Sequence, residues 1–326
     1  MNFKHLSSVM SCMVFLAFLA GCQRPGQMRG SDGDNYKAET SPSYYSRGGP
    51  KGASQRVEQM GQPRKRVMIL NFWNDTPVPM TDLGAFAADE LKRGLFLTQR
   101  MVLPTDLKLE HGTEDFVQGE KVKVSQLIRE GRKLGVAVLG IGRISKVVFR
   151  QRGDEVGIFR QKQSLAAVDV EMKLFDVSGG KEIFAGAKSG DAAVNAVVTF
   201  DAKATESADY RAELVKSASR NAVAQLVPEV VRAVEKLAWE GRVAKVAGSK
   251  VYINSGRASG LIGGDILRVM GPGDDIYDPT NSAYLGRTQG QLKGTLEVID
   301  FIGSDGAVAE IHTGGNFQEG DSVQLY

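Results

Sequence analysis

Residues 168–187 read VDVEMKLFDVSGGKEIFAGA, and this stretch decides the fold of the larger folded part of the chain. Between Val168 and Leu174, apolar residues alternate with charged residues, which is typical of an antiparallel strand with one buried face. Residues 178–181 (SGGK) have the composition of a tight turn, and residues 182–187 return as a second strand. The stretch therefore predicts a β-hairpin with one face against a hydrophobic core.

The sequence before this hairpin predicts further strands. Residues 67–72 (VMILNF) form a continuous apolar run of the kind found in buried strands, and the residues that follow are typical of a turn. A short strand is expected at 101–103, where Pro104 ends it, and a longer one over 135–149. Together with the hairpin, these strands predict a mixed sheet.

Three helices are expected around the sheet. Apolar residues recur at helical spacing over 81–96, with Thr81 as a plausible N-cap, and a shorter helix is predicted over 125–134. After the hairpin, a long amphipathic helix is predicted over 206–239, with a bend at Pro228. The sequence thus predicts an α+β fold in which a long amphipathic helix ends the first domain.

The last part of the chain, residues 241–326, has a different character. It is rich in glycine, shows no convincing helical pattern, and alternates short apolar runs with turns. The runs are 243–247, 251–254, 266–270, 292–302, 307–311 and 322–326. This pattern predicts a small, glycine-rich domain that resembles a β-barrel.

The N-terminal residues predict an exported lipoprotein. Lys4 precedes an apolar run over 9–20 that is too short for a permanent membrane span. The run ends in LAGC (19–22), which resembles the lipobox of bacterial lipoprotein signals. Cleavage is expected between Gly21 and Cys22, and the Cys22 thiol would carry the lipid. The alternatives are an ordinary buried first helix and an uncleaved anchor.

The cysteines, Gln23 and residues 23–63 indicate how the mature chain would be anchored and tethered. Cys12 would leave with the signal peptide, so the mature chain would keep only the acylated Cys22 and could form no internal disulfide. Gln23 stands where an Asp would favour retention at the inner membrane, so the outer membrane is expected. Residues 23–63 are rich in Gly, Ser, Pro and charge, and they would reach about 35 Å as a flexible tether.

The predicted domain organisation has four parts. A lipoprotein signal peptide covers 1–21, and a disordered tether covers 22–63. The α/β domain covers 64–240, and the β domain covers 241–326. Because the apolar stripe of the long helix ends just before Trp239, we expect few contacts across the junction at 239–241.

The search for catalytic, cofactor and metal residues finds no convincing pattern. His111 and His312 lie in polar contexts in different domains, without further ligands at zinc-binding spacing. An acidic cluster lacks the spacing of a calcium loop, so a solvated turn is expected there. Its members are Asp274, Asp275, Asp278 and Asn281. The net charge of +3 does not indicate a nucleic acid partner. We therefore expect no enzyme activity, no cofactor, no metal and no small-molecule substrate.

Two resemblances to known families cover nearly all of the folded chain. Residues 252–256 (YINSG), 260–265 (GLIGGD), 278–280 (DPT) and 320–321 (GD) resemble the C-terminal domain of flagellar assembly protein T. The α/β domain resembles the one shared by curli secretion-channel lipoproteins, penicillin-binding-protein activator lipoproteins and the N-terminal part of the Tol system's protein B. That match lies in the strand ending Asn71-Phe72, in 134–136 (LGV) and in 169–176 (DVEMKLFD).

These resemblances imply a non-enzymatic component of an envelope machine, foremost a flagellar-type periplasmic ring. Its partners would be the membrane, reached through the lipid, and proteins of the machine, with a homo-oligomer as one option. A curli-type secretion channel is the alternative, with its membrane hairpins near 145–165 and 187–205. Within residues 149–163, both the odd-numbered and the even-numbered positions include polar residues or glycine, so neither face of a strand there would form a lipid-facing apolar band. A peptidoglycan-synthase activator is a further alternative.

Overall fold

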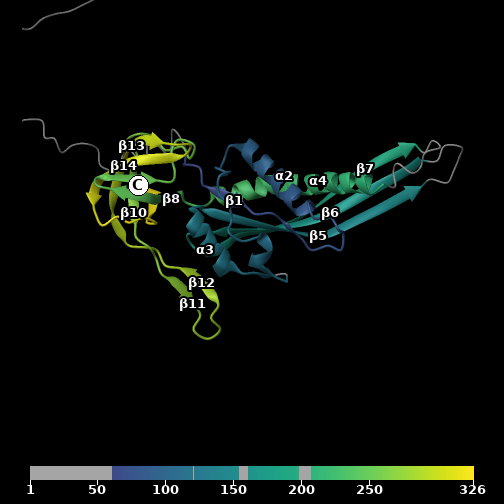
Figure 1. Ribbon diagram of the computed structural model, residues 1–326, viewed down its shortest axis with the longest axis horizontal. Coiled ribbons are helices and arrows are strands. Elements are labelled where there is room, and N and C mark those ends of the chain that lie inside the picture. The colour runs from purple at the N-terminus through teal and green to yellow at the C-terminus, as the bar shows by residue number, and fades with distance from the viewer. Residues whose placement is uncertain (1–60, 120, 154–160, 198–206) are drawn as a thin grey trace, which may run out of the picture. The chain divides into compact units, whose positions relative to one another are not determined.

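The computed structural model describes residues 61–119, 121–153, 161–197 and 207–326. These residues belong to one compact unit that contains a mixed sheet with helices and a β-barrel (Figure 1). The elements of the sheet and its helices are β1 (Val67–Ile69), β2 (Trp73–Asn74), α2 (Leu83–Thr98), η1 (Thr113–Phe116), β3 (Val117–Gln118), β4 (Lys121–Val122), α3 (Val124–Leu134), β5 (Val138–Gly153), β6 (Gln161–Asp176), β7 (Lys181–Val197) and α4 (Ala208–Glu235).

The central sheet has the strand order β1-β5-β6-β7. β1 and β2 pair with β5 in parallel, whereas β5, β6 and β7 pair antiparallel, so the sheet is mixed as the sequence predicts. The alternation in the deciding stretch is confirmed: Val168 and Leu174 are fully buried, while the charged residues between them are only partly buried. The turn into β7 depends on Gly180, which has a φ of +67°, and on the Asp176 carboxylate, which accepts backbone N–H bonds.

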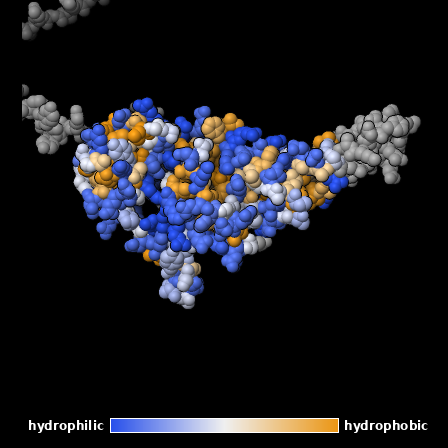
Figure 2. All heavy atoms as spheres, viewed as in Figure 1, coloured by the Kyte–Doolittle hydropathy of each residue, from blue (hydrophilic) through white to orange (hydrophobic). Residues whose placement is uncertain are grey.

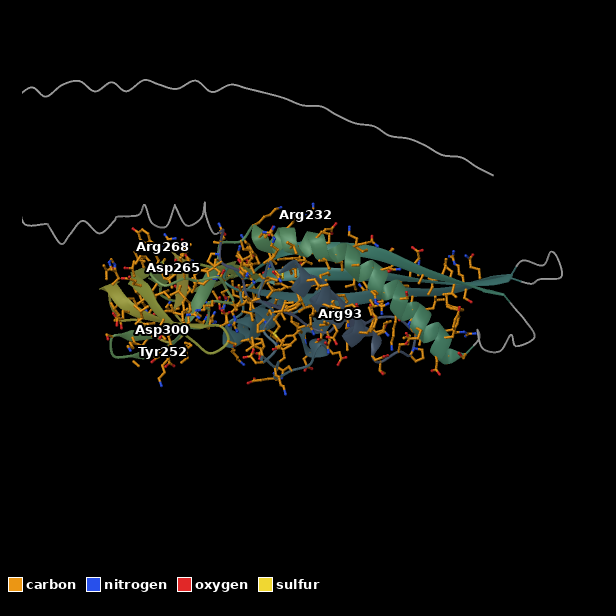
Figure 3. The ribbon with its side chains drawn as sticks, turned by 90° about the horizontal axis from the view of Figure 1, so that it is seen from above. Arg93, Arg232, Tyr252, Asp265, Arg268 and Asp300 are labelled. Carbon is orange, nitrogen blue, oxygen red and sulfur yellow. The ribbon has the colours of Figure 1, made fainter. Side chains whose placement is uncertain are left out.

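Helices α2 and α4 cover one face of the sheet, and Figure 3 shows α4 lying across the strands. Ser207 caps α4 by accepting a hydrogen bond from the Tyr210 amide at 3.2 Å. The other face packs on α3 and η1 through a second cluster that includes Phe116, Leu127 and Phe175. Each face of the sheet therefore has its own apolar core. Among the described residues, no helix is both long and apolar enough to span a membrane.

The C-terminal part closes into a six-stranded barrel, which confirms the prediction for this domain. The strand order around it is β10-β13-β14-β9-β8-β15. The barrel strands are β8 (Glu240–Ala247), β9 (Lys250–Ile253), β10 (Ile266–Met270), β13 (Leu292–Ile302), β14 (Gly306–Gly314) and β15 (Ser322–Leu325). Its interior is filled by a separate apolar cluster that includes Trp239, Leu267 and Leu296. A barrel this small is filled by side chains and has no lumen.

A two-stranded hairpin stands outside the barrel, between β10 and β13. It consists of β11 (Asp275–Tyr277) and β12 (Tyr284–Arg287), which form their own sheet. We call this hairpin the arm; it projects from the barrel in Figure 1. A two-stranded hairpin is marginally stable by itself, so the arm depends on contacts at its base.

Candidate assembly surfaces

The structure places the residues that the sequence singled out as follows. Gly21 and Cys22 lie outside the described residues. The His312 ring lies 3.1 Å from the Thr295 hydroxyl, and the His111 ring packs near Phe116. Among the described residues, no group of three or more histidine, cysteine and acidic side chains could hold a metal ion.

The acidic cluster forms the arm and its tip. The side chains of Asp278 and Asn281 accept backbone N–H bonds from Thr280 and Ala283, which fixes the turn between the two strands. Asp275 points the other way, toward α3. The cluster therefore divides between turn formation and a contact with the α/β domain.

Arg132, at the end of α3, holds the base of the arm. Its two terminal nitrogens donate to the two oxygens of Asp275 at 2.9 and 2.8 Å, and one of them also donates to the Tyr284 hydroxyl at 3.1 Å. A bidentate pair of this kind is strong and geometrically specific. Hydrogen bonds from Arg132 lower the pKa of the Asp275 carboxyl. The Tyr284 ring also packs against the Gly180 turn, so the arm contacts two elements of the α/β domain.

A second set of contacts joins the barrel wall to the sheet. The Asn254 side chain donates to the Gly135 carbonyl at 3.0 Å and accepts from the Arg242 amide at 2.8 Å. Arg242 also donates to the Arg132 carbonyl. Since Gly135 has a φ of +65° at the end of α3, a side chain there would be strained and would meet Asn254. These contacts lock the end of α3 against the barrel.

A third contact set uses Arg66, at the start of the sheet. Its guanidinium donates to the Asn254 carbonyl at 2.5 Å and lies 3.6 Å from the Asp305 carboxylate. Asp305 in turn accepts hydrogen bonds from the Gly256 and Ser259 amides. Polar side chains far from the junction in sequence therefore connect the two parts, and the expectation of few contacts across 239–241 stays a prediction. The domain boundaries themselves stay a prediction.

A cavity of about 250 Å³ lies between these contacts. Arg132, Arg242, Arg287 and Glu240 line it, together with the glycine-containing segments at both ends of the arm. Burial, and then the nearby Asp176 carboxylate, raise the pKa of the Glu240 carboxyl above its ordinary value, against the opposing charge of Arg242. The cavity thus contains an acid that is easier to protonate in the folded protein than in the unfolded chain.

This raised pKa gives a testable pH dependence. Because the folded state binds the Glu240 proton more tightly than the unfolded state does, stability should fall as pH rises from 4.5 through the folded pKa. We expect Glu240→Gln to remove that fall, so that the variant exceeds the wild type in unfolding free energy at pH 8 and the two converge below pH 4.5. Urea unfolding across this pH range measures it. Glu310→Gln, at an exposed position of β14, should leave the pH profile unchanged, and equal profiles for Glu240→Gln and the wild type would contradict the assignment.

Comparisons with known proteins show no family for this chain. No family model matches it, and no curated protein matches it. Solved structures with a low likeness include a hypothetical protein, CT253, from Chlamydia trachomatis (13% identity, 52% of this chain and 98% of that chain, TM-score 0.34). Another is the lipoprotein GNA1162 from Neisseria meningitidis (12% identity, 53% of this chain and 99% of that chain, TM-score 0.27). A third is the C-terminal domain of LpoB from Escherichia coli (15% identity, 42% of this chain and 91% of that chain, TM-score 0.24). At these TM-scores, the likenesses carry no argument about this protein.

Proposed function

We propose that this protein is an outer-membrane lipoprotein, anchored through an acylated Cys22, whose folded part faces the periplasm. It acts as a non-enzymatic structural or assembly component of an envelope machine. The observation that carries this proposal is the set of polar contacts that joins the arm and the barrel to the α/β domain. Charged side chains such as Arg132, Asp275 and Arg66 are used to fix the arm and the barrel on the α/β domain. A fixed arrangement of surfaces is what docking partners require.

The machine that we propose first is a flagellar-type periplasmic ring. The support is the resemblance of residues 252–256, 260–265, 278–280 and 320–321 to the C-terminal domain of flagellar assembly protein T. The proposed partners are proteins of the ring, including further copies of this chain. Neither a nucleic acid nor a small-molecule substrate is part of the proposal.

A curli-type secretion channel is the second candidate, and the length of the strands favours it. β5, β6 and β7 have 16, 16 and 17 residues, and a strand of about 9–11 residues is enough to cross a membrane. The proposed membrane hairpins, near 145–165 and 187–205, include 154–160 and 198–205, which lie outside the described residues. A peptidoglycan-synthase activator rests on the resemblance of the α/β domain and on the proposed lipid tether.

The anchor is tested by metabolic labelling. We expect the wild-type protein to incorporate labelled palmitate and to sediment with outer-membrane fractions in a density gradient. Cys22→Ser should incorporate no label and should appear either as a soluble protein or as an uncleaved precursor, because the serine cannot form the thioether that carries the lipid. Cys12→Ser is the matched control and should behave as the wild type. An unlabelled wild-type protein would refute the proposed anchor.

A further inference from the structure

An open groove runs along the outer edge of β1, and we call it the edge groove. It has a volume of about 450 Å³ and a mostly apolar lining that includes Phe96, Leu103, Pro104 and Leu107. Phe96 is 69% exposed, although it is large and apolar. On the face seen in Figure 2, hydrophobic surface lies between hydrophilic patches over the region of α2 and β1. An exposed apolar groove of this kind is typical of a docking site.

β1 forms the buried floor of this groove, because Val67 and Ile69 are 0% and 3% exposed. β1 is the end strand of its sheet, and β5 occupies only one of its sides. On the other side, the Val67 amide donates to the Val102 carbonyl, and in the described residues no strand continues this pairing along Met68 and Ile69. The groove therefore offers an occupant apolar side chains, and the backbone of β1 lies covered beneath them.

The arm has the complementary properties. Ile276, Tyr277 and Leu285 are 42%, 48% and 61% exposed, so apolar side chains lie on the outside of a projecting hairpin. Gly286 of β12 is buried beside the Gly179 carbonyl, so the arm meets a partner through its exposed side chains. The arm is also held at its base by Arg132, so it would enter a groove with little loss of conformational entropy.

The charges of the two surfaces are opposite. Lys92 and Arg93 line the edge groove and pair with Asp89 and Glu90 on the same helix, and the Arg93 side chain is still 69% exposed. Arg93 is labelled on α2 in Figure 3. The arm carries the exposed Asp274 at its base and Asp278 near its tip. Complementary charges around an apolar contact favour the correct partner and orientation.

The arm cannot reach the groove of its own chain without breaking its anchors. It is bonded to α3, which covers one face of the sheet, whereas the edge groove lies beside α2, which covers the opposite face. Because the arm and the groove lie on different faces, the arm of one copy can contact the groove of the next copy in a head-to-tail arrangement. Repeated contacts of this type generate rings when the rotation closes and filaments when it does not.

We propose that the arm of one copy docks in the edge groove of a second copy through its exposed apolar side chains, placing Leu285 near Phe96. This inference rests on the proposed function and names the contact by which copies of the chain would assemble. It predicts that the surface formed by α2 and β1 and the surface of the arm are used together, in a head-to-tail arrangement.

Cysteine crosslinking tests the contact in the lipidated full-length chain. Two differently tagged copies, one with Phe96→Cys and one with Leu285→Cys, are co-expressed and exported, and disulfide-linked mixed dimers are quantified on non-reducing gels of the membrane fraction. The acylated Cys22 does not compete for disulfides. We expect the mixed pair to give roughly tenfold more dimer than a pair in which Ile299→Cys, 42% exposed on β13, replaces Leu285→Cys.

Charge reversal provides the second measurement. Arg93→Glu in the Phe96→Cys copy should lower the yield of mixed dimer severalfold, and Asp274→Arg in the Leu285→Cys copy should restore it. Equal yields for the Leu285 and Ile299 pairs, or dominant dimers of the Phe96→Cys copy with itself, would overturn the proposal. Failure of the reversed charges to restore the yield would also count against it. Since palmitate labelling is scored separately, a labelled protein without this crosslink refutes the contact and leaves the anchor intact.

Discussion

Gly190→Ala is expected to destabilise the protein by about 3 kcal/mol, the upper part of the range for overpacked sites. Gly190 is buried in β7 where the strand passes under α4, and a Cβ there would overlap the backbone of Ala218 and Ala222. Backbone atoms of a helix cannot move aside as the end of a side chain can, so the helix would have to separate from the sheet. The residues that pack in this core from α4 would then lose their contacts together.

The matched control is Gly186→Ala, four residues earlier in the same strand. There the added Cβ would meet only the ring of Phe184, which can move, so we expect a loss within about 1 kcal/mol. Urea unfolding of the soluble mature chain without Cys22 measures both variants. Similar losses at the two positions would show that α4 does not lie as close to β7 as described.

Arg132→Met is expected to cost about 2 kcal/mol at neutral pH, the value typical of hydrogen bonds to a charged group. Met retains much of the length of the side chain but cannot donate to Asp275 or Tyr284, and the remaining cation near Asp275 is Arg287 at 3.9 Å. Arg129→Met, at an exposed position of the same helix, is the control and should change stability by less than about 0.5 kcal/mol.

Arg132→Met should also change the pH dependence of stability and the rate at which the arm is proteolysed. The pKa of Asp275 is lowered in the folded protein, so its contribution is present above the ordinary value of 3.8 and is lost as pH falls through the folded pKa. The difference between wild type and Arg132→Met should therefore shrink in acid. The released arm should also be cut faster by thermolysin before Ile276 or Leu285. Unchanged cleavage with reduced stability would show that Arg132 does not hold the arm.

Much of the sheet and barrel could be predicted because the decisive signals are local. The alternation from Val168 to Leu174 fixes which face is buried, and the six apolar runs after 241 coincide with the six strands of the barrel. The helix starts differ from the prediction by one or two residues, and the case of α2 has a visible cause: it begins at Leu83, after Asp82, and no side chain caps it. Thr81 was a plausible cap by type, but the Phe72 amide, which donates to the Gly84 carbonyl, helps to place this end of the helix.

The arm and the junction could not be predicted, because their evidence is not local. β11 and β12 are short and exposed, so they lack the buried alternation by which strands are recognised. Arg132 has the local pattern of a solvated helix cation, and its partner Asp275 lies 143 residues away. Only the tight turn at Asp278 and Asn281 was visible in the sequence. Contacts between residues so far apart need a fold before they can be recognised.

The position of Arg64 and Arg66 has a mechanical consequence. The Arg64 amide donates to the Ser259 carbonyl, the Arg66 guanidinium bonds the barrel, and the Arg66 carbonyl accepts from the amides of Ala137 and Val138. A force applied through the preceding chain would thus enter the barrel and the sheet at the same point. Under the proposed lipid anchor, tension from the anchored end would therefore reach both folded parts through these hydrogen bonds.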